Sequence, residues 1–86
     1  MGKMLVIFKL YAEENGQLEG ILEEAKALKS AEFKDAKREP IAFGLECLKV
    51  GFLIPDKVEG VLEKLEADLK AIPNVTEVEQ AGMTLL

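Results

Sequence analysis

The sequence predicts an α+β fold of order βαββαβ, with four strands in one antiparallel sheet and two helices on one of its faces. Two stretches have the apolar spacing of amphipathic helices, and each lies between two strand-like runs. Two of the strand-like runs are apolar on both faces, whereas the other two are half polar. The length of 86 residues fits one domain, so we expect positions 1–86 to form a single unit.

The first two elements are an apolar strand and an amphipathic helix. Nearly every residue of positions 4–11 is apolar, which predicts a central strand covered on both faces. The apolar residues of the helix then recur at helical spacing, at Leu18, Ile21, Leu22, Ala25 and Leu28. We expect this helix to bury that stripe against the sheet.

The next two strands differ in polarity. Residues 31–38 are charged, which suits an edge strand protected against pairing with another molecule. Residues 45–54 are apolar on both faces, with Leu48, Val50, Phe52 and Ile54 on one face and Leu45, Cys47 and Leu53 on the other. This second pattern predicts another central strand.

A second helix and a last strand complete the order. The helix is expected to start after Pro55 with Asp56 as its N-cap, and its buried stripe is Val58, Val61, Leu62, Leu65, Leu69 and Ile72. Pro73 and Asn74 end it, and residues 75–81 form a half-polar edge strand. Two right-handed βαβ crossovers joined in this way give the ferredoxin-like arrangement, with the first and third strands in the middle.

One face of the predicted sheet carries no helix. Leu5, Ile7, Leu45, Cys47 and Leu53 are expected there, interrupted by Lys3, Lys9 and Lys49. An open, partly apolar face of this kind often serves for docking or self-association. The alternative is that lysine stems and loop side chains cover it.

The charge balance restricts the partners. Sixteen acidic against eleven basic residues give a net charge of −5 and a pI near 4.7. An acidic surface argues against direct binding of nucleic acid and is compatible with a basic protein partner. We expect a cytoplasmic protein without a membrane partner, because there is no long apolar run or signal pattern and one cysteine cannot form an internal disulfide.

The residue inventory does not favour an enzyme. The chain has no histidine, which removes the commonest general base and the commonest transition-metal ligand. Cys47 has no second cysteine or histidine with which to share a metal, so we interpret it as a small buried apolar residue. The single serine, Ser30, has no base nearby in the sequence. We therefore predict no catalytic residue, no metal and no cofactor.

The connection between the second and third strands is apolar where a polar turn is expected. It contains Pro40, Ile41, Ala42, Phe43 and Gly44. Pro40 fixes its own φ, and Gly44 can adopt a positive φ, so the loop is expected to be stiff. A stiff loop that presents Phe43 loses little entropy on docking, which suits an interaction anchor. The alternative is that Ile41 and Phe43 fold back as a lid on the core.

The segment from Pro40 to Leu45, followed by Leu48, Lys49 and Val50, resembles the signature of archaeal translation elongation factor 1-beta. The start of the chain and the strand-like residues 74–79 also fit, so the resemblance covers essentially the whole chain. It implies a guanine-nucleotide exchange factor that promotes GDP release from the GTPase elongation factor 1-alpha without covalent chemistry. By this resemblance Phe43 would enter an apolar pocket of the partner, with Pro40 and Gly44 setting its angle.

The C-terminal residues depart from the family pattern. Residues 80–86 carry no basic side chain, where archaeal relatives often have arginines and eukaryotic ones a lysine that reaches the magnesium site of the partner. We therefore hypothesise that exchange works by apolar wedging, through Phe43 and, at the tail, through Met83 or Leu86.

A different function class also fits the fold. A stand-alone regulatory module could bind a small ligand or a partner through the open sheet face or a dimer interface. An RNA-recognition domain would need aromatic rings on the helix-free face of the central strands, where Tyr11, at a strand end, is the sole candidate. An acylphosphatase-like enzyme would need a phosphate-cradling loop with arginine after the first strand, but residues 12–17 are acidic.

Overall fold

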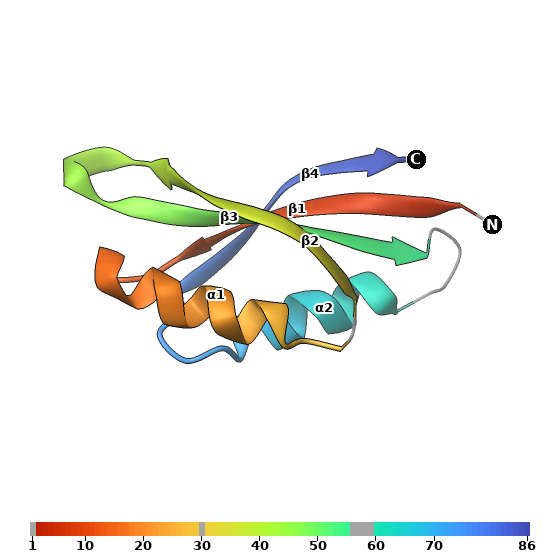
Figure 1. Ribbon diagram of the computed structural model, residues 1–86, viewed down its shortest axis with the longest axis horizontal. Helices are drawn as coiled ribbons and strands as arrows, with labels where there is room; N and C mark the ends of the chain where they lie inside the picture. Colours follow the sequence, from red (N-terminus) through yellow and green to blue (C-terminus); the bar gives the residue numbers. More distant parts are fainter. Residues whose placement is uncertain (1, 30, 56–59) are drawn as a thin grey trace.

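The computed structural model describes residues 2–29, 31–55 and 60–86. Over these residues the chain forms four strands and two α-helices in the order β-α-β-β-α-β (Figure 1). Single 3-10 turns at Asn15–Gln17 and Ala42–Gly44 precede α1 and β3. The strands are β1 (Lys3–Tyr11), β2 (Glu32–Pro40), β3 (Glu46–Pro55) and β4 (Glu77–Leu85), and the helices are α1 (Leu18–Lys26) and α2 (Val61–Lys70).

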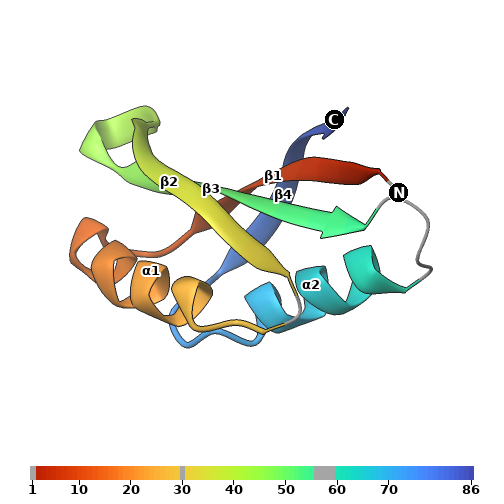
Figure 2. The same cartoon turned by 45° about the vertical axis from the view of Figure 1, so that its right-hand side comes forward.

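The strands form one antiparallel sheet in the order β2-β3-β1-β4. Both helices lie on the same face of this sheet (Figures 1 and 2). The two strands that are apolar on both faces, β1 and β3, occupy the centre, where both of their edges are paired. The predicted ferredoxin-like α+β fold and its strand assignment are confirmed.

The hydrophobic core lies between the helices and the two central strands. Alternate residues of β1 and β3 face the helices and are buried, namely Val6, Phe8, Leu10, Leu48, Val50, Phe52 and Ile54. The helical segments add the expected stripe of Leu18, Ile21, Ala25, Leu65, Leu69 and Ile72. A slip of one residue would turn a strand's apolar set to the opposite face, so this layer fixes the register of the sheet.

The two edge strands are longer than the sequence pattern predicts. β4 runs to Leu85 rather than ending at residue 81, because it pairs with β1 from Tyr11 opposite Glu77 to Met4 opposite Leu85. β2 likewise continues to Pro40, beyond the predicted end at residue 38. An edge strand needs apolar side chains on one face only, so its polar residues look locally like those of a loop.

The second helix starts later than predicted. α2 begins at Val61, directly after Gly60, whose φ of 84° lies in the left-handed region that suits glycine. The predicted N-cap Asp56 and the predicted core position Val58 lie outside the described residues. The first helix ends at Lys26, and Leu28 packs against the core from beyond its end.

The sheet face without helices combines apolar side chains with ion pairs, one of which joins Lys3 and Glu32. Leu5, Ile7 and Leu53 are half-buried there. Nearer the β2–β3 loop, Glu39 forms ion pairs with lysines of β1 and β3. Cys47 pairs directly opposite Glu39 and is fully buried, which confirms its interpretation as a small core-like residue. Charged side chains thus cover part of this face. Leu45, which was also expected on it, lies just before β3 and is half-buried.

Candidate functional site

The loop between β2 and β3 presents Phe43 to solvent. The side chain is 99% exposed, more than any other large apolar residue in the described part of the chain, and Ile41 is 40% exposed. The predicted exposure of this ring is confirmed. The alternative, in which the ring folds back over the core, is contradicted.

The backbone of this loop is strained at the aromatic residue. Phe43 has φ 60° and ψ 32°, and Gly44 follows with φ 75°. The left-handed region is open to glycine but costs a residue with a Cβ about 1–2 kcal/mol. Gly44 therefore has the role that the sequence predicted. Pro40 is the last residue of β2, paired with Glu46, rather than part of the turn itself.

Backbone hydrogen bonds close the loop. The Ile41 N–H donates to the Leu45 carbonyl at 2.8 Å, and the Leu45 N–H donates to the Ala42 carbonyl at 3.1 Å. An ion pair between Arg38 and Glu46, at 3.5 Å, lies across the two strands that enter and leave the loop. Because that pair is partly exposed, its contribution is small, and the backbone bonds carry most of the restraint.

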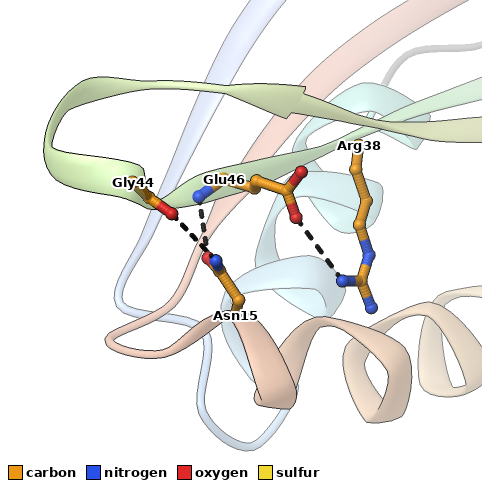
Figure 3. Close-up of polar contacts among 4 residues, drawn as sticks. All are labelled: Asn15, Arg38, Gly44 and Glu46. Carbon is orange, nitrogen blue, oxygen red and sulfur yellow. Dashed lines mark hydrogen bonds and ion pairs between the residues drawn. The ribbon is translucent and has the colours of Figure 1, made fainter.

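The side chain of Asn15 also holds the loop, from a separate part of the chain. Asn15, in the connection between β1 and α1, donates from Nδ2 to the Gly44 carbonyl at 3.0 Å and accepts the Glu46 N–H on Oδ1 at 2.8 Å (Figure 3). Sequence reasoning missed this residue, because residues 12–17 stand out only for their acidity. Asparagine at a turn is a weak signal by itself, since the strand order decides which backbone lies beside it.

The predicted tail residues lie at the other end of the sheet. Met83 and Leu86 are 40% and 68% exposed, and Leu85, which the sequence pattern did not single out, is 65% exposed. The Leu86 N–H donates to the Lys3 carbonyl at 2.9 Å, beside the N-terminal end of β1. The loop lies instead near the C-terminal end of β1, so the structure does not bring Met83 or Leu86 together with Phe43 (Figure 1). The long dimension of the molecule is 42 Å.

Ion pairs surround the residue that leads into the loop. Lys9 Nζ lies 3.0 Å from Glu39 Oε1, and Lys49 Nζ lies 3.9 Å from Glu39 Oε2. The hydrogen bond and the charge of Lys9 lower the pKa of Glu39, and Glu39 in turn raises the pKa of Lys9. Both groups are therefore charged near neutral pH, and they tie β1 to β2 just before Pro40.

The titratable groups nearby are not activated. Burial raises the pKa of the Cys47 thiol, which keeps it protonated and a poor nucleophile near neutral pH. The Tyr11 hydroxyl donates to Glu79 Oε1 at 2.7 Å, and this hydrogen bond raises the pKa of Tyr11 to about 12. The arrangement suits packing and binding rather than proton transfer.

The helix-free face carries a shallow hollow. Its volume is about 310 Å³, and its lining includes Ile7, Asp35, Lys37, Lys49 and Gly51. Glycine at position 51 leaves room there for the Asp35 side chain, because a Cβ would lie 3.0 Å from Asp35 Oδ1. The lining mixes both signs of charge with apolar surface and does not select one class of ligand.

Acidic and cysteine side chains do not gather into a metal site in the described part of the chain. Residues 2–29, 31–55 and 60–86 contain no group of three or more histidine, cysteine, aspartate or glutamate side chains placed to hold a metal ion. Over the same ranges, no helix has the length and apolar character needed to cross a membrane.

Comparison with solved structures concerns the fold. The C-terminal domain of the MgtC protein from Mycobacterium tuberculosis superposes with a TM-score of 0.54, over 100% of this chain and 88% of that chain. The sequence identity is 14%, so this likeness supports the sheet-and-helix arrangement alone.

Comparison with protein families is more specific. The model of the EF-1 guanine nucleotide exchange domain matches residues 5–86. Elongation factor 1-beta of Ignicoccus hospitalis is 39% identical over 82 residues, covering 92% of this chain and 87% of that protein. The factor of the same name from Staphylothermus marinus is also 39% identical and covers 92% and 91%, and that of Sulfurisphaera tokodaii is 33% identical and covers 100% and 98%. The chain belongs to the EF-1 guanine nucleotide exchange family, to which the elongation factors 1-beta of archaeal translation also belong.

Proposed function

We propose that this chain promotes release of GDP from elongation factor 1-alpha, so that GTP can rebind, and that residues 1–86 act as one exchange domain. The observation that carries the proposal is the fully exposed Phe43 on a strained, hydrogen-bonded loop in a chain of this family. The chain acts by binding and makes no covalent bond. Its setting is the cytoplasm, and its partner is a protein rather than a nucleic acid or a membrane.

Exchange follows from differential binding. A factor that binds the nucleotide-poor state of a GTPase more tightly than the nucleotide-bound state weakens nucleotide affinity by the same factor. A thousandfold faster release requires only about 4 kcal/mol off the dissociation barrier. Binding energy of this size is within reach of a few well-placed anchors.

Phe43 is suited to be the main anchor. Full burial of a phenylalanine side chain that was exposed contributes about 1.5–3 kcal/mol. Because the backbone of the loop is already fixed, little conformational entropy is lost when the ring docks. Ile41 and Ala42 directly precede Phe43 in the loop, and Pro40 and Gly44 determine the direction in which the turn projects.

The tail is a second contact region in this proposal. Met83 and Leu86 offer apolar surface at the end of the sheet opposite Phe43. If both regions contact the same GTPase, they contact separate parts of it, because the molecule is 42 Å long. Without a basic side chain in residues 80–86, the tail contributes apolar contact rather than a cation that could displace magnesium.

The proposal is tested by nucleotide release. Elongation factor 1-alpha loaded with fluorescent GDP is mixed with excess unlabelled nucleotide, and the loss of signal is followed with and without this chain. We expect a large acceleration by the wild-type chain and only a modest change when a lysine is inserted before Leu86. No acceleration, together with a tight homodimer, would favour the regulatory module instead.

A further inference from the structure

We propose that Asn15 is a positioning residue for the loop that carries Phe43, so that its carboxamide controls how well the chain engages its GTPase partner. The inference rests on the proposed function, since it takes Phe43 to be the anchor. Asn15 belongs to the connection between β1 and α1, outside both the loop and the tail.

The carboxamide of Asn15 completes the edge of β3 where β1 ends. β1 and β3 are paired as far as Leu10 and Leu48, and the chain then leaves the sheet toward α1. The Glu46 N–H at the start of β3 and the Gly44 carbonyl in the turn before it bond to Asn15 instead (Figure 3). A carboxamide combines an acceptor and a donor in one group, so it supplies what a longer β1 would have supplied.

These two bonds lock consecutive peptide groups of the loop. The peptide between Gly44 and Leu45 donates its N–H to the Ala42 carbonyl at 3.1 Å, and its C=O accepts from Asn15 at 3.0 Å. The next peptide accepts on the Leu45 carbonyl from the Ile41 N–H at 2.8 Å and donates its Glu46 N–H to Asn15 at 2.8 Å. Each peptide is thus held on one side by the loop and on the other side by Asn15.

The position of Phe43 makes this support necessary. An aromatic residue with φ 60° is in a conformation that persists only where the surroundings enforce it. The peptide that Asn15 holds begins at Gly44, which directly follows Phe43. Loss of the carboxamide therefore frees the C-terminal side of the turn and lets Phe43 relax toward more favourable backbone angles.

Asn15 is itself fixed by the turn that begins α1. The Gln17 N–H donates to the Glu14 carbonyl at 3.1 Å, and the Glu14 N–H donates to Gln17 Oε1 at 3.3 Å. The next residue, Leu18, is fully buried in the core. The carboxamide is therefore presented from a turn anchored to the core and not from a mobile connection.

The first test compares Asn15→Ala with Gln17→Ala. The control removes one exposed side-chain hydrogen bond of the same turn but keeps the backbone bond from the Gln17 N–H to the Glu14 carbonyl, which holds the turn that carries Asn15, and it does not touch the β2–β3 loop. We expect Asn15→Ala to lower the efficiency of GDP release about 3- to 10-fold, chiefly by raising the concentration needed for half-maximal rate. In 15N relaxation measurements on the free chain, Phe43 and Gly44 should gain motion in Asn15→Ala only.

The second test is a double-mutant cycle with Phe43→Ala. If Asn15 acts through the ring, Asn15→Ala has no further effect on exchange once the ring is absent. Additive effects would overturn the proposal, as would unchanged loop motion in Asn15→Ala. If the wild-type chain fails to accelerate GDP release at all, the proposed function fails, while the relaxation measurement still decides whether Asn15 orders the loop.

Discussion

The two ends of the sheet expose apolar side chains in different ways. At the loop end, Phe43 projects from a turn whose peptide groups are hydrogen-bonded and whose backbone is strained. At the tail end, Met83 and Leu85 are exposed near the end of an edge strand and Leu86 directly follows it, and none of the three has a positive φ. Strain of about 1–2 kcal/mol is maintained only where the fold supports it, so the loop end is the pre-organised one.

This difference predicts unequal contributions to exchange. A rigid anchor loses little entropy on docking, whereas side chains on a strand end must be ordered by the partner. The loop end should therefore dominate binding, and the tail end should adjust it. Variants at each end of the sheet test that ranking.

The largest effect is expected from Phe43→Ala. Loss of a ring that is buried only in the complex should lower the exchange rate more than tenfold, which corresponds to at least about 1.4 kcal/mol. The free chain should keep its stability within about 0.5 kcal/mol, because the ring is exposed. Nucleotide release and thermal unfolding, measured on the same sample, separate these two outcomes. A large drop in unfolding temperature would show that the ring supports the fold instead.

A smaller loss is expected from Gly44→Ala. A Cβ added at this position would meet no atom within 4 Å, so the cost comes from its φ of 75° alone. We expect a destabilisation of about 1 kcal/mol and a several-fold loss of exchange as the turn changes shape. Gly20→Ala in α1 is the matched control, since it also has open space and no positive φ. Equal behaviour of the two variants would contradict the role given to the turn.

The tail variants should have weaker effects still. Replacing both Met83 and Leu86 by alanine removes half-exposed or exposed apolar surface from the opposite end of the sheet. We expect the exchange rate to fall about two- to threefold, as for residues that surround an anchor without being one. Titration of the GTPase with each variant measures the change. A loss as large as that of Phe43→Ala would reverse the ranking of the two ends.

The smallest effect concerns the ion pair at the base of the loop. Lys9 lowers the pKa of Glu39 in the folded chain, so the pair stabilises the fold above the ordinary glutamate value of 4.5. That stability is lost as the pH falls through the lowered pKa of Glu39. Glu39→Gln should therefore be less stable than the wild type at pH 7 and equally stable at strongly acidic pH. Urea unfolding at a series of pH values measures this difference, and a gap that does not depend on pH would contradict it.

The sequence predicts the fold better than it predicts the site. Apolar residues on both faces place β1 and β3 at the centre because burial is a property of the strands themselves. The ends of β2 and β4 are less predictable, since an edge strand and a polar loop have similar compositions. The start of α2 differs because Gly60, and not a residue next to Pro55, directly precedes the helix.

Within the site, the sequence predicts the features that depend on neighbouring residues in the loop itself. Pro40 and Gly44 indicate a stiff turn. An exposed apolar ring between them, that of Phe43, indicates a contact site for a partner. The contribution of Asn15 could not be predicted, because its partners Gly44 and Glu46 lie about thirty residues away and meet it only through the strand order. The separation of Met83 and Leu86 from Phe43 likewise depends on the full length of β4.

The most direct test follows the ring itself into the complex. The chain contains no tryptophan, so Phe43→Trp labelled with 5-fluorotryptophan places a single fluorine at the tip of the loop. The variant is first checked for GDP release and then mixed with nucleotide-free elongation factor 1-alpha. Burial of the ring predicts a shifted 19F resonance that no longer responds to exchange of H2O for D2O. A resonance that keeps its solvent response in the complex would show that Phe43 is not the buried anchor.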